Sequence, residues 1–172
     1  ILLNCNPGVI FKAKRDVRPA IQASFPAPGG AWMTYSINDK CNGCSACKLL
    51  CPVDAISGER KEAHHINPLR CVNCGVCGRV CAQGAVLDDQ GQPAVRIPRK
   101  QWPLPVIDAH LCSACSMCVD ICGKQALAIS TPAYKGDLRV YAVLSNPKNC
   151  VGCSLCAQIC PLGAVTMEVQ LS

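Results

Sequence analysis

The sequence predicts an α+β chain built from two small modules in tandem, and three observations lead to this prediction. The first is a cysteine pattern that occurs four times, with the spacing Cys-x2-Cys-x2-Cys-x3-Cys. The second is the distance between these runs, which groups them into two pairs. The third is a set of short apolar segments around each pair, which favours short strands separated by turns.

The four cysteine runs account for 16 of the 17 cysteines, and only Cys5 falls outside them. Within a run, three cysteines at three-residue steps let one short loop wrap three corners of an iron–sulfur cube. The fourth cysteine points away and reaches the cube of a neighbouring run. The spacing therefore predicts four [4Fe–4S] clusters. The runs are Cys41, Cys44, Cys47 and Cys51; Cys71, Cys74, Cys77 and Cys81; Cys112, Cys115, Cys118 and Cys122; and Cys150, Cys153, Cys156 and Cys160.

A chain with this many cysteines could also use them in disulfides or in zinc sites. A disulfide framework is common in short cysteine-rich chains, but cysteines three residues apart in one loop bridge poorly and 17 is an odd number. Structural zinc sites pair two-cysteine knuckles at a distance, without triplets that have a fourth cysteine three residues later. The spacing favours clusters over both.

The four segments CNGCSACKLLCPVDAI, CVNCGVCGRVCAQGAV, CSACSMCVDICGKQAL and CVGCSLCAQICPLGAV resemble the bacterial ferredoxins with two [4Fe–4S] clusters, as two of them fused in tandem. The resemblance covers roughly residues 34–172 and implies a ferredoxin-like fold. The proline that usually follows the fourth cysteine is present as Pro52 and Pro161. It is replaced by Ala82 and Gly123 in the other two runs, which removes no ligand.

The resemblance also implies that each cluster takes three cysteines from one run and the fourth from its partner. Neighbouring runs are expected to be partners, because 19 residues separate Cys51 from Cys71 and 30 separate Cys81 from Cys112. In the four-cluster subunits of molybdopterin oxidoreductases, the two outer runs pair with each other and the two inner runs pair with each other. Those subunits have a long interval between runs one and two, which this chain lacks. The expected clusters are Cys41/Cys44/Cys47/Cys81, Cys71/Cys74/Cys77/Cys51, Cys112/Cys115/Cys118/Cys160 and Cys150/Cys153/Cys156/Cys122.

The chain is expected to divide into a basic arm (1–33), a first module (34–91), a connector (92–105) and a second module (106–172). Short helical turns should follow the third cysteine of each run, as in Lys48–Leu50. A turn at Lys135–Asp137 should give the second module a longer hairpin than the first. The expected strands are Thr34–Ile37, Ala55–Ser57, His64–Ile66, Ala85–Leu87, Val106–Asp108, Leu127–Thr131, Leu138–Leu144 and Val165–Leu171.

Charge first suggests a nucleic-acid partner, since the formal net charge is +6. Four oxidised clusters with their thiolates supply about −8, so the loaded protein would sit near −2. Each module contains equal numbers of basic and acidic side chains. The excess of basic residues lies in the arm and in Arg96, Arg99 and Lys100. Aromatic residues make up only 4% of the chain, so no stacking platform for bases is evident and no nucleic-acid partner is expected.

The connector contains prolines at 93, 98, 103 and 105, which favours an extended strap over helix or sheet. Its basic residues are expected to lie against the clusters or against an acidic partner. Alternatively, they are solvated residues of a simple linker. Trp32 and Trp102, nine and ten residues before the first cysteine of their modules, are expected to pack against each small core.

Residues 1–32 show no recognisable motif, and Met33 is an expected natural start. No run of 18 apolar residues predicts a membrane span, and the reducing cluster chemistry suggests the cytoplasm. Cys5 is expected to be an inert thiol. His64, His65 and His110 are expected to be strand or loop residues, since every cluster already has four cysteines.

No catalytic constellation, phosphate loop or dinucleotide fingerprint is present, so no enzyme activity of its own is expected. The chain is expected to be an electron-transfer subunit of an anaerobic oxidoreductase, between a tungsten or molybdenum catalytic subunit and a flavin subunit or ferredoxin. It most resembles the small subunit of multi-subunit tungsten aldehyde oxidoreductases. Class II benzoyl-CoA reductase, formylmethanofuran dehydrogenase and hydrogenase complexes remain alternative parent enzymes. A free polyferredoxin, a zinc-binding interaction module and self-association into a filament remain alternative functions.

Modules this small are expected to unfold without their clusters.

Overall fold

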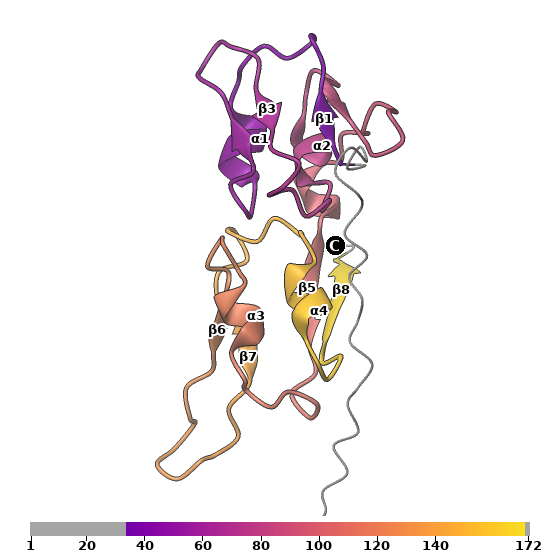
Figure 1. Ribbon diagram of the computed structural model, residues 1–172. Coiled ribbons are helices and arrows are strands. Elements are labelled where there is room, and N and C mark those ends of the chain that lie inside the picture. Colours follow the sequence, from indigo (N-terminus) through magenta and orange to yellow (C-terminus); the bar gives the residue numbers. More distant parts are fainter. Residues whose placement is uncertain (1–33, 171–172) are drawn as a thin grey trace, which may run out of the picture. The chain divides into compact units, whose positions relative to one another are not determined.

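The computed structural model describes residues 34–170, which belong to one compact unit, Trp32–Ser172 (Figure 1). The expectations for the basic arm, Cys5, Trp32 and the start at Met33 lie outside the described residues. Among residues 34–170 no helix is long and apolar enough to cross a membrane.

The first module consists of two short antiparallel strand pairs and two single-turn helices. β1 pairs with β4, so that the start of the module is tied to its end, and β2 pairs with β3. Each of these strands is only two residues long, which is shorter than the sequence predicts. The elements are β1 (Ser36–Ile37), α1 (Ala46–Leu50), β2 (Ile56–Ser57), β3 (His65–Ile66), α2 (Val76–Val80) and β4 (Val86–Leu87).

The second module repeats this arrangement with longer outer strands (Figure 1). β5 pairs with β8 over five residues, from Pro103 opposite Val169 to Ile107 opposite Val165, and β6 pairs with β7 over three. The α+β fold class and the tandem repeat of short helices and short strands are confirmed. The elements are β5 (Pro103–Ile107), α3 (Met117–Asp120), β6 (Leu127–Ile129), β7 (Ala142–Leu144), α4 (Leu155–Ile159) and β8 (Val165–Val169).

The strand predicted over Leu138–Leu144 is wrong in its first half, because β7 begins only at Ala142. The carboxylate of Asp137 accepts the backbone N–H of Ala133 at 3.2 Å and of Arg139 at 3.0 Å. These bonds curl residues 133–139 into a loop. Leu138, whose alternation suggested a strand, is 90% exposed at its tip.

The connector is not free of regular structure, which corrects the prediction of a strap without helix or sheet. It contains a short 3-10 helix, η1 (Arg99–Gln101), and β5 begins within it at Pro103. Prolines 103 and 105 fit a strand because β5 pairs only with β8 and has one free edge, where a missing N–H costs no ladder bond. The second sheet therefore starts three residues before the predicted module boundary at 106.

Each module has its own small core, and the cysteines are part of both cores. A third buried cluster lies between the modules and consists of Val76, Trp102 and Val151. The sequence predicts that Trp102 packs against the core of the second module. It packs with Val76 of the first module and Val151 of the second, and it is only 5% exposed.

Candidate metal centre: four cavities, each lined by four cysteines

The 16 cysteines of the four runs line four separate cavities, four to each. Every cavity takes three cysteines from one run and the fourth from the neighbouring run of the same module. These are the sets that neighbour pairing predicts. Cavity I is lined by Cys41, Cys44, Cys47 and Cys81; cavity II by Cys71, Cys74, Cys77 and Cys51; cavity III by Cys112, Cys115, Cys118 and Cys160; and cavity IV by Cys150, Cys153, Cys156 and Cys122.

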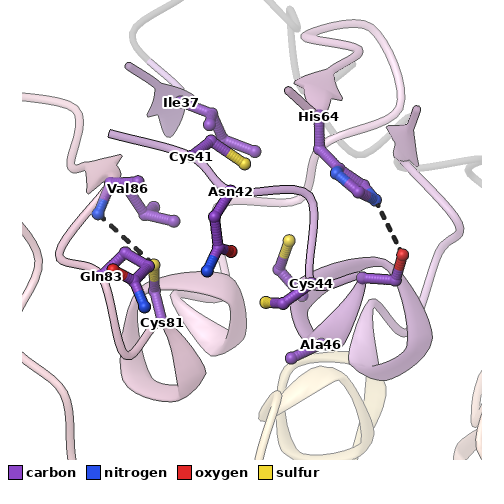
Figure 2. Close-up of a pocket in the computed structure, with 12 residues that line it drawn as sticks. Ile37, Cys41, Asn42, Cys44, Ala46, His64, Cys81, Gln83 and Val86 are labelled. Atoms are coloured by element: carbon purple, nitrogen blue, oxygen red, sulfur yellow. Dashed lines mark hydrogen bonds between the residues drawn. The ribbon is translucent and has the colours of Figure 1, made fainter. Parts of the chain in front are cut away.

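The exchange of fourth cysteines follows from the pairing of helices within a module. The third cysteine of each run lies in the first turn of a helix, and the fourth lies one residue after that helix in three runs and two residues after it in the third run, where α3 ends at Asp120. Because α1 contacts α2 and α3 contacts α4, the cysteine that ends one helix reaches the cavity of the other. Figure 2 shows this in cavity I, where Cys41 and Cys44 come from the loop before α1 and Cys81 comes from the end of α2.

The loop of each run owes its shape to two residues in the left-handed region of backbone space. One stands immediately before the second cysteine and the other immediately after it. Successive turns of this kind direct backbone N–H groups into a concave site that favours anionic groups. Each helix then begins one residue before the third cysteine, slightly earlier than predicted. The left-handed residues are Gly43 and Ser45, Asn73 and Gly75, Ala114 and Ser116, and Gly152 and Ser154.

The fourth cysteine of every run accepts a hydrogen bond from the backbone N–H of an alanine four residues later. The N···S distances are 3.3–3.4 Å. Donors aimed at sulfur stabilise the thiolate and tune a bound metal. No role was predicted for these alanines from the sequence, although an alanine at this position in all four runs is a visible signal. The pairs are Ala55 and Cys51, Ala85 and Cys81, Ala126 and Cys122, and Ala164 and Cys160.

Burial controls the protonation of the third cysteine of each run. It raises the pKa of Cys47 to about 11 and the pKa of Cys77 and Cys156 to about 12, and it raises the pKa of Cys118 as well. Negative charge on neighbouring cysteines of the same cavity raises these pKa values further. A neutral thiol is therefore the stable form at pH 7 unless a metal replaces the proton.

The donor set fits an iron–sulfur cube better than a single ion. Across residues 34–170, no three Cys, His, Asp or Glu side chains are grouped so that they could hold one metal ion. The four cysteines instead surround a common cavity, and none of the 16 forms a disulfide. A tetrahedral zinc ion needs all four sulfurs about 2.3 Å from one point, whereas a cube offers one iron corner to each thiolate.

The side chain of His64 lies near Cys44 (Figure 2). It is the most deeply buried polar side chain among the described residues, with 1% exposed. It lines cavity I, and its Nδ1 lies 3.1 Å from the carbonyl oxygen of Glu62 while its Nε2 lies 3.2 Å from Oγ of Ser45. Because a carbonyl can only accept, Nδ1–H donates to Glu62, and Nε2 then accepts the Ser45 hydroxyl. His64 thus supports the left-handed residue next to Cys44.

The missing proline after the third run has a steric explanation. A Cβ atom on Gly123 would overlap the backbone carbonyl of Pro52, which belongs to the first module. Lys124 Nζ donates to the carbonyl of Leu49 at 3.0 Å in the same region. Gly123 is therefore a contact point between the modules, a role that the sequence analysis did not assign to it.

Comparison with protein families now places the chain. The 4Fe-4S dicluster domain matches residues 40–85 and 111–164, one match in each module, and these cover more than half of the chain. The chain belongs to the 4Fe-4S dicluster domain family. A second 4Fe-4S dicluster domain profile matches residues 70–127, across the inner two runs. That match reflects the shared spacing, because the cavities join Cys71, Cys74 and Cys77 with Cys51 rather than with a cysteine of the third run.

Among characterised relatives of this dicluster chain, the polyferredoxin protein MvhB of Methanothermus fervidus is 31% identical over 59% of the chain and 22% of the relative. The methylamine utilization ferredoxin-type protein MauM of Methylophilus methylotrophus is 27% identical over 92% of the chain and 76% of the relative. Hydrogenase-4 component A of Escherichia coli is 28% identical over 58% of the chain and 44% of the relative. The chain thus spans about a fifth of the first relative and about three quarters of the second.

Among solved structures, the dicluster chain is similar to a chain of the formate dehydrogenase–heterodisulfide reductase–formylmethanofuran dehydrogenase complex of Methanospirillum hungatei. The match covers 76% of this chain and 53% of the other, at 24% identity and a TM-score of 0.30.

Proposed function

We propose that the chain holds four [4Fe–4S] clusters and passes single electrons between them as a subunit of a multi-subunit oxidoreductase. The observation that carries this is the set of four cavities, each lined by four cysteines from two runs. The clusters supply one-electron chemistry when bound. The protein supplies the thiolates, the N–H groups aimed at sulfur and the spacing between the cavities.

The cavities differ in exposure in a way that suits entry and exit of electrons. The second cysteine of cavity I, Cys44, and that of cavity III, Cys115, are exposed. The corresponding Cys74 of cavity II and Cys153 of cavity IV are partly buried. Cavities I and III are therefore the better candidates for exchange with partners, and cavities II and IV for transfer inside the protein.

Several relatives carry names that support a place in a larger enzyme. Hydrogenase-4 component A and the indolepyruvate oxidoreductase subunit IorA of Pyrococcus horikoshii are named as parts of oxidoreductases. We infer that the partner here is a catalytic oxidoreductase subunit. Our specific proposal is a tungsten or molybdenum enzyme of the aldehyde oxidoreductase kind in the cytoplasm, with a flavin subunit or a ferredoxin as the second partner.

Anaerobic purification from the native host tests both parts of this proposal. We expect about 16 iron and 16 sulfide ions per chain, which is the content of four clusters. We also expect a stoichiometric larger subunit that contains tungsten or molybdenum. Zinc without sulfide would refute the cluster proposal, and an iron-loaded chain that purifies alone would refute the subunit and favour a free polyferredoxin.

A further inference from the structure

One arginine of the second cysteine run bonds to both modules at their junction. Nη2 of Arg79, in α2, donates to the carbonyl oxygen of Cys74 at 3.0 Å and to that of Gly152 at 2.9 Å. Cys74 lines cavity II, and Gly152 immediately precedes Cys153 of cavity IV. One guanidinium group therefore ties together the loops that line two cavities in different modules.

A tryptophan fixes the position of this arginine. Two guanidinium groups lie over the buried ring of Trp102. The guanidinium carbon of Arg79 is 5.6 Å from the ring centroid, and the guanidinium carbon of Arg99 is 4.7 Å from it. Such cation–π contacts are strengthened where water is excluded. The indole N–H donates to the carbonyl of Ile97 at 2.9 Å, which sets the orientation of the ring.

Arg99 completes the junction from the connector. Its Nη2 donates to the carbonyls of Lys148 at 2.6 Å and Cys150 at 2.9 Å. Arg99 is exposed and makes both of these hydrogen bonds within the chain. Arg96, three residues earlier, is exposed and makes no hydrogen bond or ion pair within residues 34–170.

The modules approach each other closely at this point. A Cβ atom on Gly152 would lie 2.7 Å from the carbonyl of Pro103 and 3.1 Å from Nη1 of Arg79, so only glycine fits. Arg79 itself bonds to the loop of Cys74 at cavity II and to the loop that leads into Cys153 at cavity IV. Cavities II and IV are therefore neighbours across the junction, and the cavities follow one another in the order I, II, IV, III.

We propose that Arg79, held against Trp102, is the positioning residue for electron exchange between the two modules. It sets the separation of cavities II and IV, and its permanent positive charge favours the reduced, more negative state of the groups bound there. In each exchange one electron leaves one side and enters the other, and no bond breaks and no proton moves. This inference rests on the proposed function, because it concerns the same four clusters.

The test uses the full chain, loaded with iron and sulfide, in three arginine variants. Arg79→Gln removes both the charge and the paired hydrogen bonds, Arg79→Lys keeps the charge alone, and Arg96→Gln removes an exposed charge nearby as a matched control. Iron and sulfide content is measured first. A reductive titration followed by electron paramagnetic resonance then reports the cluster potentials and the spin–spin interaction between neighbouring clusters.

We expect Arg79→Gln to lower the potentials of two of the four clusters and to weaken one spin–spin interaction. Arg79→Lys should restore the potentials without restoring the interaction, and Arg96→Gln should match the wild type in both. Full loading of Arg79→Gln with unchanged potentials and interaction would overturn the role of Arg79 and leave the proposed function intact. A wild-type chain that binds no iron and sulfide would instead refute the proposed function.

A second variant applies if Arg79→Gln does not fold. Trp102→Phe keeps an aromatic ring beside both arginines but removes the N–H bond to Ile97, so the net charge is unchanged. We expect a weaker spin–spin interaction with potentials close to those of the wild type. An interaction of wild-type strength in Trp102→Phe would overturn the proposal that Trp102 holds Arg79 in place.

Discussion

At the scale of single residues, much of the backbone strain and desolvation found within residues 34–170 lies around the cysteines. Non-glycine residues such as Ser45 and Asn73 adopt left-handed backbone conformations, which cost energy. The third cysteines are buried with raised pKa values. These costs are concentrated in the segments that line the four cavities, where a bound cluster would offset them.

Substitution of the fourth cysteine of one run tests the pairing of runs. Cys81→Ala should remove the cluster of cavity I and lower the iron content by about a quarter. Its paramagnetic spectrum should match that of Cys44→Ala and differ from that of Cys74→Ala, because Cys44 shares a cavity with Cys81 and Cys74 does not. A spectrum that matches Cys74→Ala would show that the pairing is wrong. Cys5→Ala serves as the control and should keep four clusters.

Substitution of Gly123 tests the contact between this residue and Pro52. Gly123→Ala should destabilise the protein by about 1–3 kcal/mol, the usual cost of overpacking, because the new methyl group overlaps the Pro52 carbonyl. The measurement is the guanidinium concentration at which the cluster absorbance is bleached under anaerobic conditions. Ala82→Ser, at the exposed equivalent position of the second run, should leave that midpoint unchanged. Equal midpoints for the two variants would count against the contact.

At the scale of elements, helices of four or five residues and strands of two to five cannot be stable alone. They are arranged by contacts that close each module, such as β1 with β4 and β5 with β8. The connector joins the same network through η1 and the first residues of β5. It is a structural part of the junction as well as a link between modules.

Truncation of Trp102 should show how much the connector contributes to stability. Trp102→Ala removes a buried ring that contacts Val76 and Val151, and we expect a loss of about 3–5 kcal/mol. The midpoint of anaerobic guanidinium unfolding should fall accordingly. Tyr134→Ala removes an aromatic ring that is 61% exposed and should have little effect. A similar midpoint for both variants would mean that the buried cluster contributes little.

The loop of residues 133–139 depends on one carboxylate. Hydrogen bonds from the backbone N–H groups of Arg139 and Ala133 hold the pKa of Asp137 below its usual range, so it is ionised at neutral pH. Asp137→Asn replaces one accepting oxygen with a donor and should loosen the loop. Trypsin should then cleave after Lys135 and Arg139 faster than in the wild type. Glu168→Gln, remote in sequence and in β8, is the control, and equal cleavage rates would argue against the role of Asp137.

At the scale of the whole molecule, the described residues form a series of four cysteine-lined cavities across two modules that share a buried contact. A chain of this size has little apolar core of its own, and several core residues are cysteines. Metal binding to such a protein is coupled to its folding. The four clusters would therefore act as structural cross-links as well as electron carriers.

Removal of iron should unfold the described modules. Treatment with an iron chelator under oxidising conditions, followed by a reductant to keep the thiols free, should abolish most of the far-ultraviolet circular dichroism. Anaerobic reconstitution with iron and sulfide should restore it. An iron-free protein that still unfolds cooperatively in denaturant would contradict the idea that clusters hold the fold.

The amino-acid sequence by itself determined the features that depend on local spacing. The cysteine runs, their grouping into two modules and the single-turn helices all follow from residues close together in the chain, and so does the expectation of cluster ligation. The alanine four residues after each fourth cysteine belongs to the same class, since its N–H reaches a sulfur in its own loop.

Only the tertiary structure decided how the two modules meet. The contacts of Arg79 with Gly152, of Gly123 with Pro52 and of Trp102 with both modules join residues that are far apart in sequence. No periodicity or spacing records such contacts, because each depends on the final position of a backbone carbonyl or a ring. The strand predicted from Leu138 failed for a related reason: the Asp137 carboxylate competed successfully for the backbone N–H groups nearby.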